Sequence, residues 1–176
     1  NQIEGNNQIA YSFREERKFD QAVAAYQRNL TLDTDNQVKW NELVASTYRD
    51  GGKHDEAIAV YDGLRNSDID NSERWMWQIA YTHHHYTGKH KDAIGWYRQC
   101  TNFPSNYQQM ADCHRRMKEY REAIILYGQI IGGSEGTAPW AMLQIGQTHE
   151  DAGDKEKAIQ AFQQVCKLFP KDGHAS

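Results

Sequence analysis

One five-residue pattern occurs five times in this chain and constrains its fold more than any other feature. Each copy reads alanine, then isoleucine or valine, then two variable residues and an aromatic residue. The copies begin at Ala22, Ala57, Ala93, Ala123 and Ala158, and they end at Tyr26, Tyr61, Tyr97, Tyr127 and Phe162. The alanines lie 35, 36, 30 and 35 residues apart. A repeat of this length predicts a solenoid of stacked helix pairs, in which each repeat contacts its neighbours.

The residues around each copy have the spacing of two amphipathic helices joined by a turn. In the last repeat, Met142, Ile145 and Gly146 form one stripe, and a second stripe begins at Ala158 and Phe162. Glycine ends the first helix, and an acidic residue in the opening turn of the second opposes the helix dipole. These acidic residues are Asp20, Asp55, Asp92, Glu122 and Glu156. The small repeated alanine suits a close helix crossing, and the aromatic fills the space beyond it.

This pattern resembles the tetratricopeptide repeat (TPR), and the resemblance covers nearly the whole chain. The last repeat matches the family pattern best, through Trp140, Ile145-Gly146, Gly153, Ala158, Phe162 and Pro170. Arg17 and Lys118 stand where the family usually has glycine. The resemblance implies an all-α, right-handed superhelical solenoid of about five helix pairs, in a single array over residues 1–176. The repeats are expected at residues 3–36, 38–71, 74–104, 105–136 and 138–172.

Composition and charge narrow the classes of function. The chain has 20 basic and 24 acidic residues, a net charge of −4, whereas a nucleic-acid-binding protein usually has a basic excess. No apolar run reaches the roughly 18 residues that a membrane span needs, so no membrane insertion by this segment is expected. Cys100, Cys113 and Cys166 form no C-x-x-C motif, which favours small buried side chains over disulfides or a zinc site. The chain begins without methionine, so we expect a fragment or a processed product.

Neither a catalytic site nor a metal site is predicted. His83, His84 and His85 are consecutive, and neighbouring helical residues point about 100° apart, so they are not expected to converge on one ion. His84 falls at a repeat position that favours a buried or interfacial histidine. Cys113 and His114 are expected to diverge in the same way, and the sequence lacks the common nucleophile, phosphate-binding and dinucleotide-binding motifs. We therefore expect no enzymatic activity, no cofactor and no bound metal.

Two tryptophans are candidates for contact with a partner. Trp75 and Trp140 both fall at the second position of a repeat when the repeated alanines are aligned. In TPR arrays this position lies on the inner, concave wall, where aromatic side chains suit contact with a peptide or a sugar. The alternative is that both tryptophans pack between adjacent repeats.

Two rows of charged residues are predicted along the first helices. One row reads Arg14, Arg49, His85, Arg115 and Glu150, and the other reads Glu15, Asp50, Tyr86, Arg116 and Asp151. The rows either pair with each other between neighbouring repeats, at about 0–1 kcal/mol per exposed pair, or form a track for an acidic peptide. The clamp for a terminal carboxylate found in chaperone-binding TPR proteins is not reproduced. The corresponding places hold Asn7, Glu42, Gln78, Gln108 and Leu143.

The predicted function is a protein-protein interaction scaffold or adaptor that binds a partner protein or peptide in the concave groove. Its predicted contacts are Arg14, Arg49, Trp75, His85, Tyr86, Arg115, Arg116 and Trp140. Two alternatives stay open. One is a self-associating structural module, and the other is a component of a cell-envelope polysaccharide or secretion apparatus whose aromatic residues contact carbohydrate.

The last predicted helix has an apolar stripe that bears on association of the protein with other molecules. Ile159, Phe162 and Cys166 form an apolar stripe with no later repeat in the sequence to cover it, so we expect another helix in the parent protein or association through this end. The ending that starts at Phe169-Pro170 resembles repeats of bacterial periplasmic TPR proteins. Unpaired cysteines favour a reducing compartment instead. The cytoplasm and the bacterial envelope therefore both stay possible compartments. The resemblance to periplasmic repeats favours the bacterial envelope.

Overall fold

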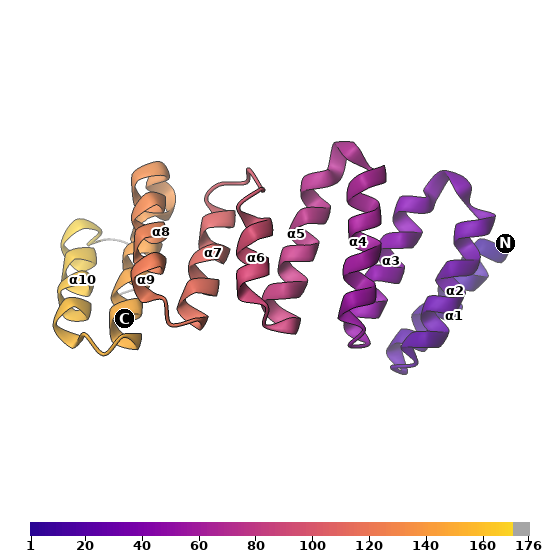
Figure 1. Ribbon diagram of the computed structural model, residues 1–176, viewed down its shortest axis with the longest axis horizontal. Coiled ribbons are helices and arrows are strands. Elements are labelled where there is room, and N and C mark those ends of the chain that lie inside the picture. Colours follow the sequence, from indigo (N-terminus) through magenta and orange to yellow (C-terminus); the bar gives the residue numbers. More distant parts are fainter. Residues whose placement is uncertain (171–176) are drawn as a thin grey trace. The chain divides into compact units, whose positions relative to one another are not determined.

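The computed structural model describes residues 1–170, which form ten α-helices and no strand. Contacts group the chain into two compact units, Asn1–Gln99 and Cys100–Ser176. The first unit contains α1 (Gln2–Glu15), α2 (Phe19–Leu32), α3 (Gln37–Asp50), α4 (His54–Ser67), α5 (Ser72–Thr82) and α6 (His90–Tyr97), as Figure 1 shows. The second contains α7 (Ser105–Arg116), α8 (Tyr120–Gly133), α9 (Ala138–Asp151) and α10 (Lys155–Leu168). The predicted all-α class is confirmed.

Within each unit, every helix packs on the helix that follows it in the sequence. Short 3-10 turns connect one pair to the next, namely η1 (Thr34–Asn36), η2 (Ile69–Asn71) and η4 (Glu135–Thr137). The predicted repeat bounds stay a prediction, and the end of the predicted repeat 138–172 lies outside the described residues. A single array over residues 1–176 stays a prediction. Among residues 1–170, no helix has both the length and the apolar character that a membrane crossing requires.

The turn inside each helix pair contains one residue with a positive φ angle. Glycine fills this place in three repeats, at Gly52 (81°), Gly88 (67°) and Gly153 (81°). The other two turns place Arg17 at 58° and Lys118 at 61°. A side chain in this left-handed conformation brings its Cβ close to the backbone, and glycine avoids that cost. The geometry therefore explains why glycine is usual at this position, and Arg17 and Lys118 adopt the same conformation at a cost.

The repeated alanine and aromatic residue form the core of each helix pair. Nine of these ten residues are buried, namely Ala22, Tyr26, Ala57, Tyr61, Ala93, Tyr97, Ala123, Tyr127 and Ala158. Phe162, in the last helix, is only partly buried. The predicted packing role of the pattern is confirmed for the nine buried residues.

The third repeat departs from the others on both sides of its turn. After α5 the chain continues as a π-helical turn, η3 (His83–Thr87). Such a turn accommodates an inserted residue within a helix, and this accounts for the spacing of 36 rather than 35 between Ala57 and Ala93. The next helix, α6, has 8 residues whereas α2 and α4 have 14. Its shortness contributes to the spacing of 30 between Ala93 and Ala123.

Candidate functional site

Two of the arginines predicted to line a peptide track connect neighbouring repeats. Arg14 of α1 donates from Nη2 to Asp50 of α3 at 2.6 Å. Arg115 of α7 donates to Asp151 of α9 from Nη2 at 2.6 Å and from Nε at 3.2 Å. It also donates from Nη1 to Gln144 of α9 at 2.9 Å. At these two positions the structure shows the pairing between rows that was one of the two predicted alternatives.

Each of these arginines also interacts with the repeated tyrosine of its own helix pair. Burial opposes the charge of Arg14, but hydrogen bonds to Asp50 and Tyr26 outweigh burial and raise its pKa. Burial likewise opposes the charge of Arg115, and hydrogen bonds to Asp151 and Tyr127 raise its pKa. Both guanidinium groups are therefore kept charged and are oriented by partners inside the protein.

Arg49 of α3 lies in the same row but has no ion pair with a described residue. Its Nη1 donates to Gln78 of α5 at 2.8 Å. Its guanidinium carbon lies 5.9, 5.5 and 5.5 Å from the ring centroids of Tyr61, Tyr81 and Tyr86. Its Nε is buried and has no hydrogen-bond partner among the described residues. Where the other two arginines meet an aspartate of the next repeat, Arg49 meets Tyr86.

Aromatic and histidine side chains gather beside Arg49 at the end of α5. The ring of Tyr81 lies 4.4 Å from that of His85 and 6.0 Å from that of Tyr86, measured between centroids. His54 of α4 lies 5.4 Å from Tyr86. His85 and Tyr86 are exposed. We call Arg49, His54, Tyr81, His85 and Tyr86 the third-repeat cluster.

The histidine run is partly buried. His83 and His84 are buried, which confirms the prediction for His84. The rings of His84 and His85 stack with their centroids 4.0 Å apart. Both residues lie in the π-helical turn rather than in a regular α-helix. The rings of Tyr97 and His84 are nearly perpendicular, with their centroids 6.0 Å apart.

The structure corrects the prediction that Trp75 contacts a partner. Its side chain is fully buried, stacks on Tyr61 at a centroid distance of 6.2 Å, and donates from Nε1 to Asp68 at 2.9 Å. Trp40, which the sequence analysis did not single out, makes the corresponding contacts one repeat earlier. A linker pattern of aspartate, asparagine three residues later and tryptophan seven residues later occurs at both places. This pattern could have identified both tryptophans as packing residues.

Trp140 does not occupy the same structural position as Trp75. The extra residue in η3 lies between Trp75 and the repeated alanine, so counting back from that alanine misaligns the third repeat by one residue. Once the inserted residue is taken into account, the residue of α9 equivalent to Trp75 of α5 is Ala141, which is also buried. Trp140 precedes it, is 38% exposed, and meets the ring of Tyr127 edge-on at 5.7 Å. Trp140 is therefore accessible to a partner.

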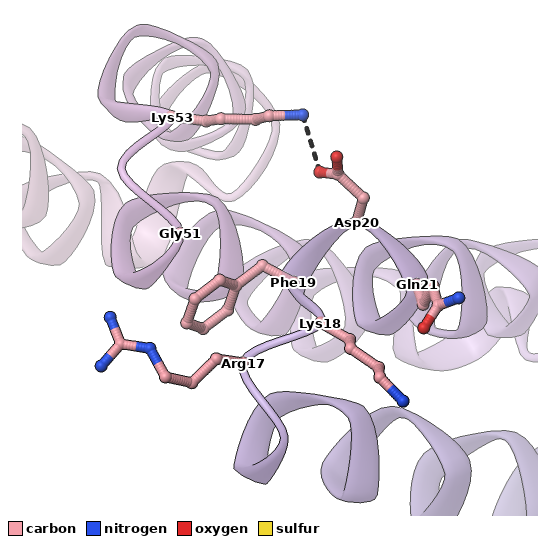
Figure 2. A pocket seen from close by; sticks show the side chains of 7 residues that line it. All are labelled: Arg17, Lys18, Phe19, Asp20, Gln21, Gly51 and Lys53. Carbon is pink, nitrogen blue, oxygen red and sulfur yellow. Dashed lines mark hydrogen bonds and ion pairs between the residues drawn. The ribbon is translucent and has the colours of Figure 1, made fainter.

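A shallow pocket of about 380 Å³ opens at the turn between α1 and α2. Figure 2 shows Phe19 over the backbone of Gly51, with Lys53 reaching Asp20 at 2.6 Å. A Cβ on Gly51 would lie 2.8 Å from the Cβ of Phe19, so this contact depends on glycine. The guanidinium of Arg17 lies 6.0 Å from the Phe19 ring. The charged side chains here are exposed and connect two repeats, and they do not form an enclosed ligand site.

Within each unit the helix pairs stack on one another, and side chains of neighbouring repeats form ion pairs. This arrangement defines the chain as an α-solenoid, the fold of many scaffold proteins. Two tetratricopeptide repeat models match its sequence, over residues 7–73 and 140–172. The chain belongs to the tetratricopeptide repeat family. Members of this family bind protein partners and are generally not catalytic, so the chain has the fold of a protein-interaction scaffold.

Solved structures show the same fold. The TPR-like repeats of a putative kinesin light chain from Podosopora anserina are 12% identical, with a TM-score of 0.68 over 98% of this chain and 97% of that one. A MamA protein is 21% identical, with a TM-score of 0.66 over 97% and 93%. BtubC (BKLC) from P. vanneervenii is 16% identical, with a TM-score of 0.65 over 94% and 79%. No curated protein matches the sequence.

Proposed function

We propose that this chain is an adaptor that binds a partner protein through the face of its first helices that carries Arg14, Arg49 and Arg115. We call this surface the first-helix face, and it is present in each of the two units. The observation that carries the proposal is that large aromatic side chains are exposed on it. Tyr11 is 59% exposed, Tyr86 41% and Trp140 38%.

The positions of these aromatics relate them to the arginine row. Tyr11 lies three residues before Arg14, and therefore one turn away on the same side of α1. Trp140 lies four residues before Gln144, to which Arg115 donates a hydrogen bond. Tyrosine and tryptophan are the residue types most enriched among the anchors of protein interfaces. The paired arginines hold neighbouring repeats in register, and the aromatics beside them supply the contact area.

Arg116 has a different place in this proposal. It donates to Asp112 of its own helix at 2.8 Å, and about half of its side chain is exposed (51%). An exposed pair of this kind contributes little to stability but can steer an acidic partner during encounter. Within the second unit, we therefore assign Arg116 to the rim of the first-helix face and Trp140 to its centre.

Site-specific photocrosslinking tests the proposal. A photoreactive phenylalanine analogue at Tyr86 or Trp140 should crosslink one discrete partner in lysate of the cells that make the protein. The same analogue at Gln129, an exposed position on the second helix α8, is the matched control and should not. Equal crosslinking from Gln129, or no discrete product from either first-helix position, would contradict the proposal.

Self-association is a second candidate, favoured by exposed apolar residues in the second unit. Ile159 of α10 is 56% exposed, whereas Val23, at the same repeat position in α2, is 4% exposed. In the same unit, a pocket of about 230 Å³ is lined in part by Ile131, Ile145 and Leu168. Light scattering of wild type and Ile159→Ser distinguishes the candidates, because only self-association predicts a dimer that the substitution dissociates. The carbohydrate alternative is weakened, because Trp75 is buried.

A further inference from the structure

Arg49 is the only member of the row Arg14, Arg49 and Arg115 without a carboxylate partner among the described residues. In the other two cases the partner is an aspartate in the first helix of the next repeat, Asp50 or Asp151. The third repeat presents Tyr86 to Arg49 instead. The other two arginines of the row each pair with an aspartate of the next repeat. Among the described residues, Arg49 lacks this aspartate.

Carboxylates close to Arg49 in the sequence are engaged with other cations. Asp50 accepts from Arg14, and Glu42 accepts from Arg74. Arg49 itself is half-buried among tyrosine rings, and its Nε is buried without a hydrogen-bond partner in the part of the chain that the structure describes. A cation removed from water is costly unless it is paired or hydrogen-bonded. The gain from a carboxylate supplied from outside is therefore larger at Arg49 than at an exposed arginine.

The surroundings of Arg49 are open to such a ligand on one side. Tyr86 and His85 are both exposed. His54 contributes a second buried polar atom, because its Nδ1 has no hydrogen-bond partner among the described residues, and its ring lies 5.4 Å from that of Tyr86. Counting partners among residues 1–170, the third-repeat cluster thus combines a cation without a carboxylate partner (Arg49), an imidazole nitrogen without a hydrogen bond (His54 Nδ1) and exposed aromatic surface.

We propose that the third-repeat cluster binds an aspartate or glutamate side chain of the partner protein, beside an apolar residue that packs on Tyr86. The incoming carboxylate accepts from Arg49, as Asp50 accepts from Arg14 and Asp151 from Arg115. A single arginine balances the one negative charge of a carboxylate, whereas a phosphate group carries about −1.5 to −2. This inference rests on the proposed function and specifies the kind of residue that the first-helix face recognises.

The test is a display selection of random twelve-residue peptides, carried out in parallel on the intact wild-type protein and on Arg49→Gln. Wild type should select peptides with an acidic residue at one fixed place next to an apolar residue. A selected peptide, capped at both ends, should bind Arg49→Gln about 10- to 100-fold more weakly, the range expected for one hydrogen bond to a charged group. Replacing its acidic residue by the matching amide should cause a similar loss.

Two further variants keep the test independent of folding defects. Tyr86→Asp supplies the missing carboxylate within the chain and should abolish selection of acidic peptides while the protein stays helical. Arg65→Gln is the matched control, because Arg65 also lies near an aromatic ring, Trp96 at 5.5 Å, but donates to its own aspartate, Asp62. The affinity of Arg65→Gln for the selected peptide should equal that of the wild-type protein.

Selection of the same acidic peptides by wild type and Arg49→Gln would overturn this inference, and so would selection without any acidic preference by wild type. Neither result would remove the proposed function. That proposal depends on crosslinks from Tyr86 or Trp140 to a discrete partner, and those can occur without any role for Arg49. Crosslinking that survives in Arg49→Gln, combined with unchanged peptide selection, would leave the adaptor in place and exclude the carboxylate site.

Discussion

At the scale of single residues, Ala93 is a position where added volume should be costly. It is fully buried one turn before Tyr97, which is also fully buried. Ala93→Leu should overpack this crossing and lower the free energy of unfolding by about 1–3 kcal/mol. Gly95→Ala in the same helix is the control. An added Cβ there meets nothing within 4 Å, so urea denaturation should show a gain of roughly 0.5–1 kcal/mol. Equal stability of Ala93→Leu and wild type would contradict this packing.

The two left-handed residues that are not glycine lead to a second prediction. Lys118 has a φ of 61°, and its side chain is exposed, so its loss removes no core packing. Lys118→Gly should raise the free energy of unfolding by about 0.5–1 kcal/mol, because glycine adopts this conformation without the Cβ clash. Gly153→Ala, at the same repeat position with a φ of 81°, should have the opposite effect in the same urea titrations. Effects of the same sign would show that φ does not control these positions.

The cysteines should differ in reactivity. Burial raises the pKa of the Cys113 thiol to about 12, and Cys100 is also buried, whereas Cys166 is exposed. At pH 8 the folded protein should therefore be alkylated at Cys166, and Cys113 should react only after denaturation. Mass spectrometry of the iodoacetamide-treated protein, with and without urea, measures this directly. Rapid labelling of Cys113 in the folded protein would show that its burial is transient.

How far single residues could be predicted depends on whether their neighbours are local in the sequence. The burial of the repeated alanines follows from spacing alone, because a helical stripe is set by residues three and four apart. The partner of an arginine was harder to predict, since Asp50 lies 36 residues beyond Arg14. The sequence suggested both pairing and a peptide track. Only the structure shows that Arg14 and Arg115 pair with aspartates and that Arg49 has no carboxylate partner among the described residues.

At the scale of helices, the contact between α9 and α10 depends on the absence of a side chain. A Cβ on Gly146 would lie 2.4 Å from the ring of Phe162, too close for the two to coexist without movement. Gly146→Ala should lower the free energy of unfolding by about 1–3 kcal/mol. Adding Phe162→Leu should recover part of that loss, which a double-mutant cycle measures. Additive effects of the two substitutions would contradict the contact.

The helices themselves were predictable, but the register within the third repeat was not. Apolar stripes and turn residues located the helix pairs, because both signals repeat about every 35 residues. The π-helical turn η3 leaves no comparable signal, since one inserted residue changes neither composition nor the stripes on either side of it. Counting back from Ala93 therefore placed Trp75 in the groove, one residue away from its true repeat position. The available indications were the spacing of 36 instead of 35 and the linker pattern that aligns Trp75 with Trp40.

At the scale of the whole molecule, the two compact units should differ in independent stability. Asn1–Gln99 contains three helix pairs, and the second unit contains two among its described residues. Solenoids generally need about three repeats to fold stably. A fragment of residues 1–99 should thus be helical by circular dichroism and unfold cooperatively in urea, whereas residues 100–176 alone should unfold at lower urea. The reverse order would show that repeat number does not determine the stability of these units.

The π-helical turn of the third repeat also bears on how such a protein can diversify. A duplicated gene segment starts with identical copies, and every copy must keep the same core to stack on its neighbours. Here a single additional codon near the end of a helix leaves the buried alanine and tyrosine in place, yet it exposes His85 and Tyr86 beside an arginine whose counterparts are already paired. One copy can acquire a distinct surface in this way while its buried alanine and tyrosine are preserved.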